Sequence, residues 1–181
     1  MNIRQMTLRL LAALILGVWT STPATAQPAA DADGTHGQFF FFGAPARPPA
    51  SDTSFLQPAP NAAVRTLVHL GGGGEAAIGR FGLATEFGGI LHTARGTVGT
   101  ISVYGAYHAR GPHPLHADPF LSAGYSGLFA ESQHANGIAA SAGVNWWFAA
   151  HRGYHPGVGV EYKLSAGAAY RELRVSVRLW Q

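Results

Sequence analysis

Histidine and carboxylate side chains are the residues of this sequence whose types and spacing could first suggest chemistry. His108, His113, His116 and Asp118 lie in one short segment that is interrupted by prolines. Imidazole nitrogens and a carboxylate are ligands that Zn²⁺ or Cu²⁺ accepts. Their spacing does not place them on one face of a helix or strand, so we interpret the segment as a solvated turn. We therefore predict no metal site and no other cofactor.

Catalytic and nucleotide-binding arrangements are also weakly supported. His69 and Glu75 fall on the same face of a strand-like segment, but six residues separate them by about 20 Å along a strand, too far for a hydrogen bond. The glycine run 71–74 lacks the following lysine, Ser/Thr and helix of a phosphate-binding loop. Such glycines let a strand bend or bring its backbone close to a bulky neighbour. We expect no enzymatic activity.

Charged residues on the polar face of several strand-like segments form the remaining candidate site. In residues 169–180, side chains alternate strictly between an aliphatic face and a charged face, which is the pattern of a β-strand. The aliphatic face consists of Leu173, Val175, Val177 and Leu179. We predict an ionic cluster of structural importance inside the fold, formed by Arg80, Glu86, Glu161, Lys163, Glu172, Arg174 and Arg178.

The elements that must position this cluster are strands. Alternation and turn chemistry predict eight of them, the phenylalanine run 39–42 and residues 64–77, 79–90, 97–108, 120–130, 136–148, 154–164 and 169–180. No segment has a convincing helical period, and the 24 glycines are spread through nearly every segment, which disfavours helices. The expected fold is an all-β, eight-stranded, antiparallel, up-and-down barrel.

Two barrels of opposite polarity fit eight such strands. A soluble lipocalin-like barrel encloses a ligand with apolar side chains, whereas a transmembrane barrel turns them toward lipid and keeps polar groups inside. Only 12% of the residues are charged, and the polar face is not the charge-rich exterior of a soluble protein. This favours the transmembrane barrel. Aromatic residues near strand ends are expected to form its interfacial girdles, namely Tyr107, Phe120, Trp146, Trp147, Phe148, Tyr154 and Trp180.

The first 26 residues suggest export. Arg4 and Arg9, a short apolar stretch and the small residues 24–26 predict a cleavable signal peptide at 1–26, too short in its apolar part to span a ~30 Å bilayer core. We then expect a flexible lead-in at 27–35 and a barrel at 36–181, with a long proline-rich loop at 44–61. Without the signal, ten Lys and Arg oppose nine Asp and Glu, so charge gives no support to nucleic-acid binding.

Several segments resemble a known family. Residues 119–125, 135–137 and 143–148, with the hairpin segments 69–75 and 82–88, are similar to the outer-membrane β-barrel domain family of small OmpA/OmpX-like and opacity-like proteins. The resemblance covers roughly residues 37–180. It implies a porin-like β-barrel of the cell envelope in the outer membrane of a diderm bacterium, in contact with outer-membrane lipid and inserted by the barrel-assembly machinery.

That family's last strand usually ends on an aromatic residue of the apolar face. Trp180 instead falls on the face of Arg178, so either a bulge resets the alternation or the assembly signal is degenerate.

The expected protein is a monomer with both termini in the periplasm and a structural or surface-interaction role. The interior of an eight-stranded barrel is just wide enough for side chains to fill, so we expect no solute conduction. A soluble periplasmic ligand-binding barrel and an outer-membrane enzyme that modifies lipids are the alternatives.

Overall fold

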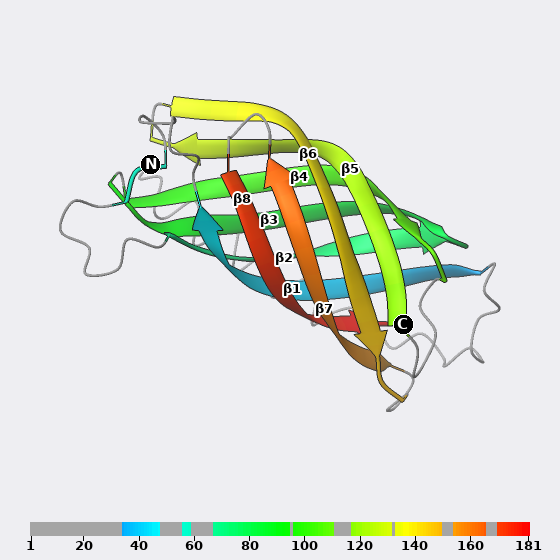
Figure 1. Ribbon diagram of the computed structural model, residues 1–181. Coiled ribbons are helices and arrows are strands. Elements are labelled where there is room, and N and C mark those ends of the chain that lie inside the picture. The colour runs from blue at the N-terminus through cyan, green and yellow to red at the C-terminus, as the bar shows by residue number, and fades with distance from the viewer. Residues whose placement is uncertain are drawn as a thin grey trace, which may run out of the picture.

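The computed structural model describes residues 34–47, 56–58, 67–94, 96–110, 117–131, 133–149, 154–165 and 170–181. Eight antiparallel strands form a closed barrel in which each strand pairs with its sequence neighbours and β8 pairs with β1 (Figure 1). This confirms the predicted all-β, up-and-down architecture. The strands are β1 (Thr35–Arg47), β2 (Leu67–Ile78), β3 (Phe81–Thr93), β4 (Gly96–His108), β5 (Ala117–Ala130), β6 (Gln133–Trp147), β7 (His155–Ser165) and β8 (Tyr170–Trp180).

The barrel has two distinct ends. At the terminal end, β1 begins at Thr35 and β8 finishes at Trp180, and the backbones of Gly37 and Gln181 exchange two hydrogen bonds that extend the closing seam. At the loop end, the chain leaves β1 at Arg47 and returns in β2 at Leu67. Among the residues that the structure describes, no helix has the length and apolar character needed to cross a bilayer.

The aliphatic face of β8 points outward. Leu173, Val175, Val177 and Leu179 are 54%, 58%, 64% and 41% exposed. The intervening residues of the same strand, Glu172, Arg174, Ser176 and Arg178, are all buried in the lumen. The other strands also alternate between exposed and buried residues, so large apolar side chains coat the outside and polar side chains line the middle of the lumen. This polarity is opposite to that of a soluble barrel that binds a ligand in an apolar interior.

The phenylalanine run of β1 lies directly against the glycine run of β2. The register pairs each residue of 39–42 with one glycine of 71–74. Phe40 and Phe42 point into the lumen, where their rings lie over Gly73 and Gly71, while the other two phenylalanines point outward. A β-carbon on Gly73 would lie 2.1 Å from the Thr85 carbonyl oxygen and 2.9 Å from the Phe40 ring. The glycines therefore make room both for bulky rings and for the neighbouring strand.

The structure corrects two boundaries. Thr35 belongs to β1 rather than to the lead-in, and residues 44–47 continue β1 rather than opening the loop. Pro45 is compatible with the strand because β1 still pairs with β2 there, whereas the pairing with β8 lapses at Ala44 and Pro45 and resumes at Ala46. The predicted signal peptide and most of the predicted lead-in and loop lie outside the described residues.

Candidate functional site in the barrel lumen

Glu86 of β3 is the centre of an ionic network that crosses the lumen. Its two carboxylate oxygens accept hydrogen bonds from Arg174 Nη1 and Nη2 at 2.7 and 2.9 Å, a bidentate pair. Lys163 Nζ of β7 forms an ion pair with the same carboxylate and donates to Ser102 Oγ at 3.3 Å. All four side chains are buried, so this network joins strands on opposite sides of the barrel through fully desolvated charges.

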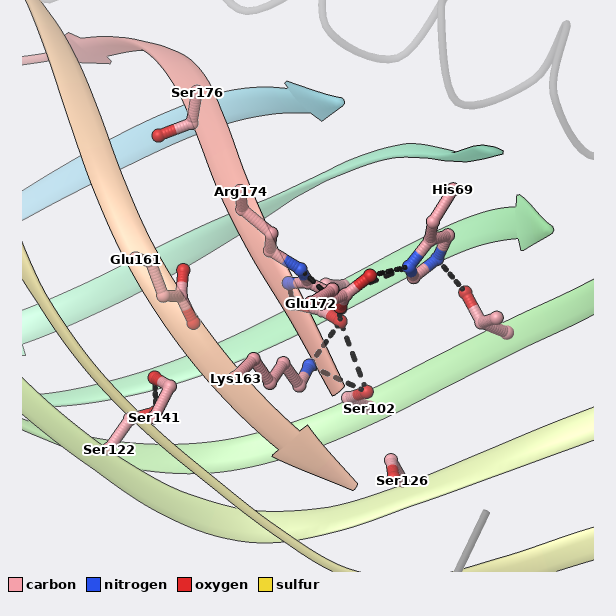
Figure 2. Close-up of polar contacts among 12 residues, drawn as sticks. His69, Ser102, Ser122, Ser126, Ser141, Glu161, Lys163, Glu172, Arg174 and Ser176 are labelled. Atoms are coloured by element: carbon pink, nitrogen blue, oxygen red, sulfur yellow. Dashed lines mark hydrogen bonds and ion pairs between the residues drawn. The ribbon is translucent and has the colours of Figure 1, made fainter. Parts of the chain in front are cut away.

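A second chain of contacts extends the network from Arg174 toward β2 and β4. Arg174 Nε donates to Glu172 Oε1 at 2.5 Å, and the other oxygen of Glu172 lies 2.8 Å from His69 Nδ1. Because an ionised carboxylate only accepts hydrogen bonds, His69 Nδ1 donates to Glu172, and Nε2 forms a second hydrogen bond with Thr100 Oγ1 at 2.9 Å. Figure 2 shows this order from Arg174 through Glu172 to His69.

A looser ion pair lies nearer the terminal end. Arg178 Nη2 is 3.8 Å from Glu161 Oε2, beyond normal hydrogen-bond distance. The guanidinium also donates to Gln38 Oε1 at 3.2 Å and Ser176 Oγ at 3.0 Å. Its carbon lies 5.0 Å from the centre of the Phe40 ring, close enough for a cation–π contact. Three cations and three carboxylates of the predicted cluster thus compensate one another inside the barrel.

Arg80 is the one member of the predicted cluster that the structure places elsewhere. It is exposed in the turn between β2 and β3, which Gly79 opens with a φ of 57°. The alternation pattern predicts a strand over residues 79–90 and so assigns Arg80 to a strand face. Because the strand begins two residues later, at Phe81, that side chain points away from the lumen.

Beyond the ionic cluster, the structure brings together polar residues whose role sequence reasoning missed. His108 lies between two carboxylates, with Nδ1 2.6 Å from Asp118 Oδ2 and Nε2 2.7 Å from Glu75 Oε1. Gln38 Nε2 donates to the second oxygen of Glu75 at 2.8 Å. Gly82 leaves the space for this carboxylate, because a β-carbon there would lie 1.9 Å from Glu75 Oε1.

The interpretation of the histidine segment as a solvated turn is therefore wrong for its first and last members. His108 and Asp118 are each 1% exposed and form a buried hydrogen-bonded pair at the strand ends. His113 and His116 lie outside the described residues. Across the described part of the chain, no three His, Cys, Asp or Glu side chains are arranged to hold a metal ion.

Aromatic rings close the terminal end of the lumen. The girdle prediction is wrong for Phe120, Trp147 and Trp180, which point inward and are at most 6% exposed. Trp180 packs edge-on against Trp147 with ring centres 6.1 Å apart and stacks on His155 at 4.4 Å. The alternation in β8 continues unbroken to Trp180, so no bulge resets it. The outward-facing members of the predicted girdle are Tyr107, Trp146 and Phe148.

An apolar plug closes the loop end. Leu56, from the connection between β1 and β2, is fully buried among side chains of six strands. Its segment is held across the barrel mouth by a hydrogen bond from Ala94 N to Gln57 O at 2.7 Å and by the bridge between Pro58 and Thr93. The other members of the plug are Ala46, Leu67, Ile90, Val98, Leu128, Ala130 and Tyr170. Between this plug and the aromatic rings, charged and hydrogen-bonded side chains occupy the lumen.

Comparisons with known proteins concern the fold. No family model matches this sequence, and a search of curated proteins finds no significant match. The N-terminal β-barrel domain of Pseudomonas aeruginosa OprF superposes with a TM-score of 0.51 at 13% identity, covering 81% of this chain and 97% of that one. Neisserial surface protein A (NspA) gives 0.51 at 12% identity, covering 81% and 96%. The chain therefore has the fold of the small, eight-stranded outer-membrane β-barrels.

Proposed function

We propose that this protein is a monomeric outer-membrane barrel with a structural or surface-contact role. The observation that carries the proposal is the apolar coat around a charged lumen. Phe41, Ile78 and Phe81 are 71%, 69% and 70% exposed. Exposed apolar side chains continue the coat on β3 to β8, among them Leu83, Val103, Leu121, Ile138, Leu164 and Val177. A continuous band of this kind is unfavourable in water and is what a bilayer core requires of a spanning barrel.

The filled interior argues against transport. Bidentate and bridging ion pairs cross the middle of the lumen, and the apolar plug and aromatic rings lie at its two ends. A solute would have to displace Arg174 and Glu86 from buried contacts, which is strongly unfavourable because it leaves desolvated charges unpaired. These features favour a static scaffold over a pore.

The lumen also contains a carboxylate, an imidazole and a hydroxyl in the order found in activated nucleophiles. Glu172 contacts His69, which contacts Thr100. However, Thr100 is only 6% exposed and His69 is fully buried, with the apolar plug next to them. A substrate could not approach the hydroxyl in this arrangement. We therefore assign the three residues to packing and orientation of the network, and propose no catalysis.

The connections at the loop end support a surface role. The connection between β1 and β2 runs from residue 48 to 66, whereas β3–β4 and β5–β6 are joined by two residues each. With the termini in the periplasm, this long connection is the chain's largest feature on the outer side. Proline-rich and charge-poor, it is the segment we propose for contact with other surfaces.

Fractionation of cells that produce the full chain tests the membrane assignment. We expect the protein in the outer-membrane fraction after an alkaline carbonate wash, and faster gel migration of the unboiled sample than of the boiled one. Closed membrane barrels resist unfolding by detergent until they are heated. A mature chain that stays dissolved and monomeric without detergent would contradict the proposal and favour a soluble carrier.

A further inference from the structure

Two arginines lie opposite each other on the outer surface of the barrel at the loop end. Arg47 is the last residue of β1, Arg171 is the second residue of β8, and the β1–β8 register makes them direct partners. Both side chains are exposed, on the same face as the aliphatic rows. Side chains of directly opposed residues start about 5 Å apart, so the two guanidinium groups can reach one common ligand.

This pairing is unfavourable without an anion. Like charges directly opposite on neighbouring strands repel and destabilise the sheet. Within the described residues, the ion pairs involve lumen carboxylates, and neither Arg47 nor Arg171 takes part in one. The across-strand partner of Arg171 on β7 is Leu164, which supplies no charge. The chain itself thus leaves two adjacent positive charges without a described counter-ion.

The position of the pair indicates where the anion comes from. The next outward residues toward the middle of the barrel are Pro45 and Leu173, and the latter begins the aliphatic row of β8. Two residues of a strand cover about 7 Å, and Leu164, the direct partner of Arg171 on β7, is 48% exposed, so the arginines lie at the edge of the apolar belt. That depth corresponds to the headgroup region of a bilayer rather than its hydrocarbon core.

We propose that Arg47 and Arg171 together bind the phosphate monoester of a lipid headgroup. Guanidinium groups bind phosphate oxygens bidentately, and a monoester carries close to two negative charges near neutral pH, enough to neutralise both cations. A phosphodiester lipid carries one. The inference rests on the proposed membrane location and adds the class of lipid that is bound. We call Arg47 and Arg171 the rim pair.

The test uses the folded barrel in a nonionic maltoside detergent. Wild type and the double variant Arg47→Gln/Arg171→Gln are titrated with phosphatidic acid, a phosphate monoester lipid, with phosphatidylglycerol, a diester, and with inorganic phosphate. The midpoint of thermal unfolding, followed by the gel shift, reports binding. The matched control is Arg80→Gln/Arg110→Gln, which removes two exposed arginines at the terminal end.

We expect phosphatidic acid to raise the wild-type midpoint, with apparent affinity at least tenfold weaker in the rim double variant and unchanged in the control. Without lipid, the rim variant should be as stable as wild type or more so, because the repulsion is gone. Equal stabilisation of wild type and rim variant by phosphatidic acid would overturn the proposal. So would equal effects of the diester or of inorganic phosphate. Because fractionation tests the membrane location separately, a barrel that inserts normally but fails here contradicts this inference alone.

Discussion

Replacing Glu86 with glutamine is expected to lower the free energy of unfolding by about 3–5 kcal/mol. Glu86 is the shared partner of Arg174 and Lys163, and all three side chains are at most 3% exposed. A neutral amide at this position leaves two buried cations with too little negative charge around them. The loss is measured by denaturant titration of the folded barrel in lipid bilayers.

Glu161→Gln is the matched control. It removes the same chemical group from the same lumen, but its carboxylate meets Arg178 only at 3.8 Å, so the destabilisation should be clearly smaller. A further variant, Glu86→Gln/Lys163→Gln, removes one charge of each sign and should recover part of the lost stability. Equal, small effects of Glu86→Gln and Glu161→Gln would show that the network does not hold the barrel together as described.

Gly73→Ala is expected to cost at least ~3 kcal/mol or to prevent the barrel from closing. The added methyl group would lie 2.1 Å from the backbone oxygen of Thr85 and 2.9 Å from the Cα of Glu86. Because these atoms belong to the backbone of the adjacent strand, no side-chain rotation relieves the contact. The measurement is the yield of the heat-modifiable folded form on refolding into detergent, followed by unfolding titration.

The neighbouring glycine provides the control. A β-carbon on Gly74 points outward and would meet the Phe39 ring at 3.4 Å, an ordinary van der Waals contact. Gly74→Ala should therefore fold with nearly normal yield, and its stability should change by less than about 1 kcal/mol. If both alanine variants fold equally well, the close packing of β1, β2 and β3 around the phenylalanine and glycine runs is not as the structure has it.

Alternation along each strand was enough to predict the fold and most of the lumen residues. The side-chain period of two assigns Glu161, Lys163 and the charged residues of β8 to one face, and the structure buries all of them. The same rule assigns His108 to the face of Ser102, and Trp147 to that of Asn145, both inward. Residue type misled the prediction at these positions, because histidines near prolines suggested a turn and terminal aromatic residues suggested a girdle.

Other features could not be predicted from the pattern. The exact start of β3 decides whether Arg80 faces the lumen, and alternation does not fix strand ends. Contacts across the lumen, such as Arg174 with Glu86 and His108 with Glu75, join strands that are not neighbours in the sheet. Which residues meet there depends on the tilt and stagger with which the barrel closes, which no single strand encodes.

The arrangement explains how a chain with few charges keeps most of its described carboxylates away from water. Charges of opposite sign face inward, where three carboxylates pair with three cations of the same or another strand, and the outside is mainly apolar. The barrel therefore has an apolar outer surface and a polar interior, the reverse of a soluble protein. Its stability should depend on the surrounding lipid as well as on the internal ion pairs.

The most direct test of this inverted polarity is an arginine placed on the outer face at mid-height of β8. Val175→Arg, measured as the free energy of unfolding in lipid bilayers, should lose about 2–4 kcal/mol, and Leu179→Arg near the terminal end should lose about 1 kcal/mol or less. This depth dependence follows if lipid surrounds the strand. Equal and negligible losses at the two positions would mean that water covers this face, and would contradict the transmembrane barrel.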